Sequence, residues 1–153
     1  MILASMTTNN GQRGEMSINE RNFRLGMEAL RGGRFKQTVN CLESTVNGQP
    51  KLCCLGVLTR VAMENGVNLV TTLDIGEYDT ITTFTDPITG DDDKYVLLPV
   101  VQAFYGFVDK NPLLNIATNV LHGPEYVNAT DCNDSLEMDF HEIADAFERT
   151  FLP

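Results

Sequence analysis

The spacing of apolar residues changes along this chain, and the change restricts it to a mixed fold. In residues 18–31, 54–65 and 140–150, apolar side chains recur every three or four positions, as on one face of an α-helix. Residues 69–98 are instead rich in β-branched and aromatic residues, which is typical of strands. The 153 residues suffice for one domain and are too few for two ordinary ones. We therefore expect a single α+β domain over residues 17–153.

The expected helices have recognisable starts. Ser17 and Glu20 stand at the spacing of a capping box before the first helix, and Asp139 and Glu142 repeat that spacing before the last. Pro99 is well placed as the first residue of a short third helix. The last helix carries a continuous apolar stripe, which predicts that it packs on the sheet.

The expected sheet is small and mostly antiparallel. Residues 35–46 alternate in polarity, and the turn signal at 47–50 predicts a hairpin-like pair. Residues 69–98 contain a second turn signal and predict a three-stranded meander. Residues 113–130 match neither pattern. The expected fold class is therefore α+β, with a small, mostly antiparallel sheet covered by about three to four helices.

Charge is distributed unevenly along the chain. The formal net charge is −10, with six basic and three acidic residues in 1–36 and five basic and eighteen acidic residues in 37–153. This gives +3 for the first segment and −13 for the second, so direct nucleic-acid binding is not expected. No apolar run approaches the ~20 residues of a membrane span, and the start has no signal-peptide pattern, so we expect a cytoplasmic protein. Residues 1–16 show no periodicity and are expected to form a mobile arm.

The cysteines fit neither a metal site nor a disulfide framework. Cys53 and Cys54 are adjacent, Cys41 and Cys132 stand alone, and the chain has only two histidines. We expect free, buried thiols, no metal and no cofactor. A nucleophilic thiol at a helix N-terminus is the alternative for Cys53 or Cys54, but the sequence places no base beside them. We identify no catalytic residues and do not expect an enzyme.

Four strings, in the same order along the chain, resemble a family of small uncharacterised proteins from tailed bacteriophages and prophages. They are ALRGGRFKQT at 29–38, CCLGVL at 53–58, LLPVVQAFYGF at 97–107 and NDSLEMDFHEIADAFE at 133–148. The resemblance covers most of residues 20–150. It implies a phage or prophage origin and action in the host cytoplasm, and it carries no known activity. The chain departs from the family pattern in the Asp131-Cys132 pair before Asn133 and in an inserted acidic meander at 74–93.

The segment 31–36, with the sequence RGGRFK, is the main candidate for a ligand site. Two guanidinium groups and an ammonium group flank a glycine turn whose N–H groups could also face an anion. The segment lacks the spacing of the known nucleotide fingerprints. The alternative is a helix C-terminus whose basic residues complement the helix dipole. The candidate ligand-binding residues are Arg31, Gly32, Gly33, Arg34 and Lys36.

Acidic residues of the predicted meander form a second candidate, a partner-binding surface. Its residues are Asp86, Asp91, Asp92 and Asp93. Their order does not match a calcium-binding loop, but a row of carboxylates could imitate DNA phosphates. The alternative is a solvated hairpin whose charges keep edge strands from aggregating.

These observations and the resemblance lead to one leading hypothesis. The protein would be a small phage-type accessory protein that acts by non-catalytic binding, and the basic segment 31–36 would sequester an anionic nucleotide-type ligand as a counter-defence. The alternative is an acidic inhibitor or DNA mimic that binds a host protein through its carboxylates.

Overall fold

The computed structural model describes residues 17–117, 121 and 123–153, so the arm predicted at 1–16 lies outside the described residues. The helices are α1 (Glu20–Arg31), α2 (Cys54–Glu64), α3 (Pro99–Tyr105), α4 (Ala129–Asp134) and α5 (Phe140–Phe151). The strands are β1 (Lys36–Gln37), β2 (Glu43–Val46), β3 (Gln49–Leu52), β4 (Val70–Ile75), β5 (Thr80–Thr85), β6 (Asp92–Asp93), β7 (Leu113–Asn115) and β8 (Tyr126–Asn128). The predicted α+β class is confirmed.

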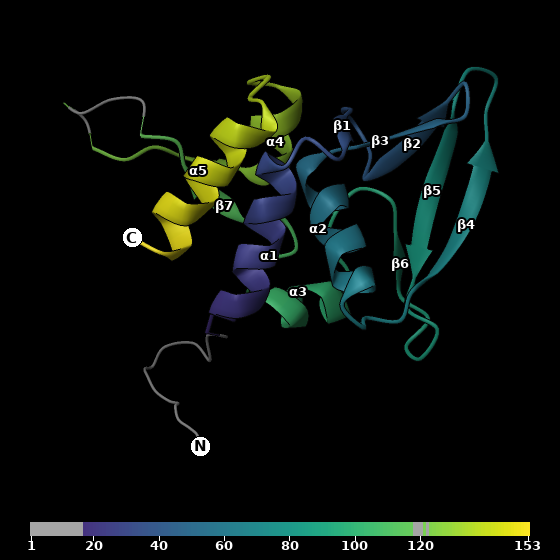
Figure 1. The fold of residues 1–153 in the computed structure, drawn as a ribbon, viewed down its shortest axis with the longest axis horizontal. Coiled ribbons are helices and arrows are strands. Elements are labelled where there is room, and N and C mark those ends of the chain that lie inside the picture. The colour runs from purple at the N-terminus through teal and green to yellow at the C-terminus, as the bar shows by residue number, and fades with distance from the viewer. Residues whose placement is uncertain (1–16, 118–120, 122) are drawn as a thin grey trace.

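The larger sheet has six strands and is mostly antiparallel. Its order is β1-β3-β2-β5-β4, and β6 pairs with β5; only the β1–β3 pair is parallel among the described residues (Figure 1). The hairpin predicted around 47–50 joins β2 to β3, and Asn47 and Gly48 both have positive φ, at 53° and 76°, as a tight hairpin turn requires. A second, two-stranded sheet is formed by β7 and β8, within residues 113–130, which match neither the helical nor the strand pattern.

The meander predicted for residues 69–98 is present, but its third strand is very short. Strands β4, β5 and β6 pair consecutively and antiparallel. The side chain of Asp93 accepts hydrogen bonds from the N–H groups of Tyr95 and Val96, at 2.7 and 3.0 Å. This side-chain turn directs the chain away from the sheet after β6.

The first helix begins later than predicted. Asn19, rather than Ser17, is the N-cap residue, and its side chain accepts a hydrogen bond from the N–H of Asn22 at 3.1 Å. The main chain of Ser17 instead lies against Gly106, where a Cβ atom would be 2.1 Å from the Ser17 oxygen. The capping box at Ser17 and Glu20 is therefore wrong, because packing against residue 106 keeps the preceding segment extended.

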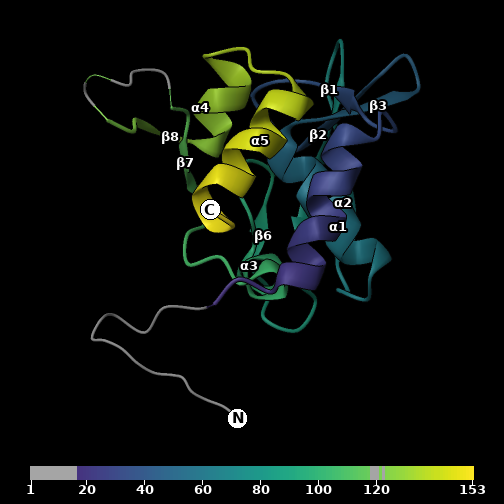
Figure 2. The ribbon, with the colours of Figure 1, turned by 60° about the vertical axis from the view of Figure 1, so that its left-hand side comes forward.

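Helix α5 is a core element, but it does not lie on the six-stranded sheet. The capping box of Asp139 and Glu142 is confirmed by both of its hydrogen bonds. The helix packs against α1 and β7, side by side with α1 in both views (Figures 1 and 2). The prediction that it covers the main sheet is wrong, because its aromatic residues join Phe23 of α1 and Phe107 in one cluster.

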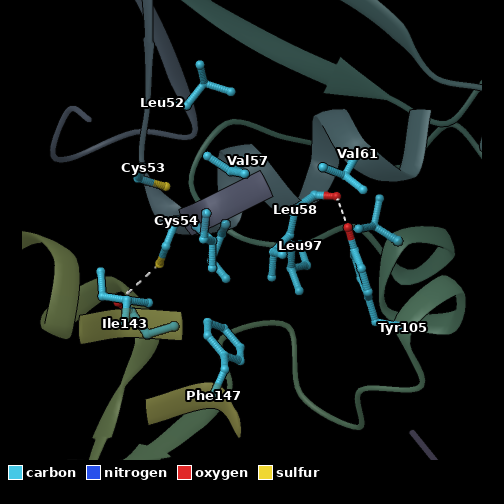
Figure 3. Packing of buried hydrophobic residues seen from close by; sticks show 14 of the residues in the cluster. Leu52, Cys53, Cys54, Val57, Leu58, Val61, Leu97, Tyr105, Ile143 and Phe147 are labelled. Atoms are coloured by element: carbon cyan, nitrogen blue, oxygen red, sulfur yellow. Dashed lines mark hydrogen bonds between the residues drawn. The ribbon is translucent and has the colours of Figure 1, made fainter. Parts of the chain in front are cut away.

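Helix α2 forms the centre of the core. Cys54, Leu55, Val57 and Leu58 are fully buried, and the Tyr105 hydroxyl donates a hydrogen bond to the carbonyl of Leu58 (Figure 3). The start of the helix touches the main chain of Leu42, where a Cβ atom on Gly56 would lie 1.9 Å from the carbonyl oxygen. The CCLGVL string is therefore a packing motif.

One buried amide joins segments that lie far apart in the sequence. The side-chain oxygen of Asn133 accepts hydrogen bonds from the N–H of Cys54 at 3.2 Å and from Gln37 at 2.8 Å. Its nitrogen donates to the carbonyl of Thr38 at 2.7 Å. Asn133 is 1% exposed, and its bond with the N–H of Cys54 is buried, while the bonds with Gln37 and Thr38 are partly buried.

Candidate ligand-binding site

The segment 31–36 divides between two sides of α1. Arg31 is the last residue of the helix, Gly32 is its C-cap, and Gly33 has a φ of 74°, which turns the chain sharply. After this turn, Arg34 and Lys36 lie on a different surface from Arg31. The structure therefore brings only part of the predicted basic cluster together.

Arg31 is bound by carboxylates of α5. Its guanidinium group donates to Glu148 at 2.7 and 2.9 Å and to Asp145 at 2.6 Å. The hydrogen bond with Glu148 raises the pKa of Arg31, and the same bond lowers the pKa of Glu148. Arg31 therefore ties α1 to α5, and an anion would have to displace two carboxylates to reach it.

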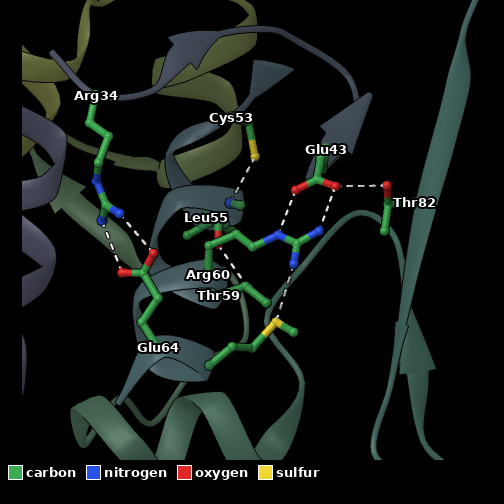
Figure 4. Close-up of polar contacts among 10 residues, drawn as sticks. Arg34, Glu43, Cys53, Leu55, Thr59, Arg60, Glu64 and Thr82 are labelled. Atoms are coloured by element: carbon green, nitrogen blue, oxygen red, sulfur yellow. Dashed lines mark hydrogen bonds and ion pairs between the residues drawn. The ribbon is translucent and has the colours of Figure 1, made fainter. Parts of the chain in front are cut away.

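Arg34 pairs with Glu64 of α2 in a more open setting. The two hydrogen bonds measure 2.7 and 3.0 Å, and the two side chains are 53% and 47% exposed (Figure 4). The guanidinium carbon also lies 4.3 Å from the centre of the Phe35 ring. Exposed ion pairs typically contribute about 0.2–1 kcal/mol, so a ligand can exchange for Glu64 at small cost.

A hollow with a volume of about 340 Å³ lies beside this pair, and we call it the basic hollow. It is lined by the loop after α1, by β1, β2 and β3, and by α2: Arg34, Phe35, Lys36, Glu43, Gln49, Pro50, Leu52 and Arg60. Three cations against one carboxylate give this lining a formal charge of +2. Together with the Phe35 ring, the hollow offers donors for an anion and an aromatic wall.

Another side of the basic hollow is formed by the ion pair of Arg60 and Glu43, which the sequence did not reveal. Arg60 donates two hydrogen bonds of 2.7 Å to Glu43, and the Thr82 hydroxyl donates to the same carboxylate at 2.9 Å (Figure 4). The side chain of Glu43 is only 7% exposed, so this pair is held firmly. The only hint of this ion pair in the sequence was Arg60 itself, a charged residue within the mostly apolar helix α2.

Lys36 of the lining has a second lysine beside it on the neighbouring strand. Lys36 and Lys51 are register partners in the parallel β1–β3 pair, so their side chains leave the same face of the sheet. Neither forms an ion pair with any residue that the structure describes. Like charges on adjacent strands repel each other, and an anion between them relieves that repulsion.

The four aspartates of the alternative site do not form an exposed row. Asp86 is 8% exposed and accepts the N–H of Ile88 at 2.9 Å. Asp93 caps the turn that follows β6, and Asp91 accepts the Thr89 hydroxyl. Of the four, only Asp92 has a side chain without a hydrogen-bond partner among the described residues. Three of these carboxylates therefore stabilise local turns.

The thiols are buried, as expected. All four cysteines are free, and burial raises the pKa of Cys53 to about 12 and that of Cys132 to about 11. Burial also raises the pKa of Cys54 well above its ordinary value. Cys53 is the N-cap of α2, where its sulfur accepts the N–H of Gly56 at 3.4 Å, so it has a structural contact.

Two further findings concern the described residues as a whole. They contain no group of three or more histidine, cysteine, aspartate or glutamate side chains that could hold a metal ion. None of their helices combines the length and the apolar character that crossing a membrane requires.

The chain was also compared with known proteins. A family model described as a domain of unknown function, DUF8296, matches residues 18–151. Comparisons with curated proteins and with solved structures give no match. The matched region runs from the segment before α1 to the last residue of α5, and so includes every element that lines the basic hollow. On this evidence the chain belongs to the DUF8296 family.

Proposed function

We propose that the protein is a non-catalytic binding protein whose basic hollow takes a small anionic ligand of the nucleotide type. The observation that carries this proposal is the convergence of Arg34, Lys36 and Arg60 with the Phe35 ring on one hollow of about 340 Å³. This volume falls in the range of about 300–1,000 Å³ that is usual for small-molecule sites.

The residues of the hollow would have different roles. Arg34 and Lys36 are exposed, and they would bind the anionic group, with Arg34 exchanging Glu64 for the ligand. Arg60 would keep its buried partner Glu43 and act as a fixed wall. Phe35 would contact a flat ring. Arg31 and Gly32 lie outside this site, because α5 already supplies the carboxylates that Arg31 binds.

The overall charge would select for compact ligands. The chain carries −10 in total, so a long duplex would be repelled even where its phosphates met the hollow. A small anion senses mainly the charges within the Debye length of about 8 Å at physiological salt. Sequestering such a ligand would suit a counter-defence role, which we propose because the chain resembles phage proteins.

Thermal-shift measurements with a panel of nucleotides and cyclic nucleotides test the proposal. At one hundred times its Kd, a ligand stabilises the folded state by about 2.7 kcal/mol. We expect the double variant Arg34→Gln, Lys36→Gln to abolish the shift. Arg31→Gln is the control for position, since it removes one positive charge from a residue outside the hollow, three positions before Arg34, and should leave the ligand-induced shift intact.

Two results would contradict the proposal. One is a panel in which no nucleotide shifts the unfolding midpoint of the native protein. The other is a ligand-induced shift that the double variant retains and Arg31→Gln loses, which would assign binding to the α1–α5 side. Inorganic pyrophosphate, tested alongside, separates recognition of the phosphates from recognition of the ring.

A further inference from the structure

We propose that the open edge of β4 is a docking site for an extended, basic segment of a partner protein, which adds to the sheet as a further strand. This surface is separate from the basic hollow and does not depend on the ligand proposed there. Strand β4 is the last strand of the larger sheet, and no other described strand pairs with its outer side (Figure 1).

The register shows which backbone groups of β4 point outward. The N–H of Gly76 donates to the carbonyl of Asp79 at 2.8 Å, so these two residues form a hydrogen-bonded pair of the hairpin. Such pairs alternate along an antiparallel ladder, and the pairing continues without a break to the start of β4. Thr71, Leu73 and Ile75 therefore present their N–H and C=O groups to the open edge.

The side chains of the same strand are exposed at every position. Leu73 and Ile75 are 60% and 80% exposed, although they lie on the face of the sheet that carries the buried Thr82 and Phe84. Helix α2 contacts that face at Phe84, where the Arg60 guanidinium carbon lies 5.1 Å from the ring centre. An added strand with apolar side chains on this face would cover Leu73 and Ile75.

Charge complementarity identifies the kind of partner. Residues 70–79, which form β4 and the turn after it, contain three acidic residues and no basic ones. Asp74 lies on β4 itself, on the face opposite to Leu73, with its side chain 73% exposed. Its carboxylate is 3.9 Å from the Lys94 ammonium group, and a basic side chain of the partner would join or replace this long, exposed ion pair. A partner strand that alternates apolar and basic residues would therefore match β4 on both faces. A second copy of this chain would bring two acidic segments together, which the charges oppose.

The probe is a synthetic peptide of eight residues, alternating lysine and valine, with both ends blocked. We expect it to bind the native protein with an affinity that falls as salt rises, and we expect its glutamate–valine counterpart not to bind. Leu73→Pro removes an outward N–H that the sheet does not use, so the fold should persist while peptide affinity falls at least about tenfold. Leu73→Ala keeps that N–H and should lose less peptide affinity than Leu73→Pro.

Hydrogen exchange on the native protein tests the proposal without any variant. Peptide binding should slow exchange at the amides of Thr71, Leu73 and Ile75, while the inward amides of Val70, Thr72 and Asp74 are already protected by β5. Each of three results would overturn the proposal: no change at the outward amides, equal affinity of Leu73→Pro and native protein, or a native dimer that Leu73→Pro converts to monomers.

Discussion

Gly56 shows how one residue sets the distance between two segments. A Cβ atom there would lie 1.9 Å from the Leu42 oxygen and 2.7 Å from its carbonyl carbon, and these main-chain atoms cannot rotate away. We expect Gly56→Ala to lower the free energy of unfolding by about 3 kcal/mol, even though alanine favours a helix over glycine by about 1 kcal/mol. Urea unfolding at equilibrium measures the loss.

Gly26 of α1 provides the matched control for this prediction. The nearest atom to a Cβ there is the Leu58 Cδ2 at 2.6 Å, the end of a flexible side chain. The gain in helix propensity offsets the crowding, so Gly26→Ala should change the free energy of unfolding by about 1 kcal/mol or less. A larger loss at Gly26 than at Gly56 would mean that α2 can move away from Leu42.

The thiols give a second prediction at the scale of single residues. Burial raises the pKa of Cys53 to about 12 and holds that of Cys54 well above its ordinary value, so neither forms a reactive thiolate at neutral pH. We expect a thiol-specific reagent to leave both residues unlabelled in the native protein. After denaturation, all four cysteines should react. Rapid labelling of either residue before unfolding would instead support the alternative that Cys53 or Cys54 is a nucleophile at the N-terminus of α2.

At the scale of secondary-structure elements, α5 is held by aromatic packing. Phe147 is fully buried, and its ring centre lies 5.8 Å from that of Phe107 and 6.3 Å from that of Phe23. We expect Phe147→Ala to lower the free energy of unfolding by about 3–5 kcal/mol. Phe151→Ala, at a partly exposed position of the same cluster, should lower the free energy of unfolding by a smaller amount. Equal losses would show that the C-terminal end of the helix is packed as tightly as its centre.

The local patterns in the sequence predicted the elements better than their arrangement. The period of apolar residues located α2 and α5, and Pro99 located the start of α3, because helix propensity and capping depend on neighbours in the sequence. The start of α1 at Asn19 depended instead on a contact between Ser17 and Gly106. The partner of α5 likewise depended on aromatic contacts across the chain, which no local pattern contains.

At the scale of the whole molecule, the candidate site also depended on contacts between distant residues, which the sequence did not predict. The basic segment at the end of α1 could be recognised in the sequence, but the carboxylates that form ion pairs with its arginines could not. Arg31 meets Glu148 across 117 residues, and Arg34 meets Glu64 across 30. These distant pairings divide one apparent cluster into an arginine that ties two helices together and a more exposed arginine.

The same ion pairs should make the stability of the whole protein depend on pH. Hydrogen bonds from Arg34 and Arg31 lower the pKa values of Glu64 and Glu148 below the ordinary value of 4.5. At a pH between the folded pKa values and the ordinary value of 4.5, the folded protein binds fewer protons than the unfolded chain. The stabilisation from these ion pairs is therefore complete above about pH 4.5. It is lost as the pH falls through the lower pKa values of the folded state. Urea unfolding between about pH 6 and pH 3 should show the decline.

A double variant tests the origin of that decline. Arg31→Gln, Arg34→Gln removes both donors, so the stability of the variant should fall less steeply with decreasing pH over the same range. An unchanged slope would assign the acid sensitivity to other carboxylates.

The hydrogen bonds of Asn133 have a consequence for how the chain is made. The buried N–H of Cys54, at the start of the central helix, has its acceptor on a residue 79 positions later. At a synthesis rate of about 5–20 residues per second, that acceptor leaves the ribosome about 4–16 s after the group it serves. During this interval the nascent N-terminal half cannot complete its core, and it is exposed to chaperones and proteases until the C-terminal quarter arrives.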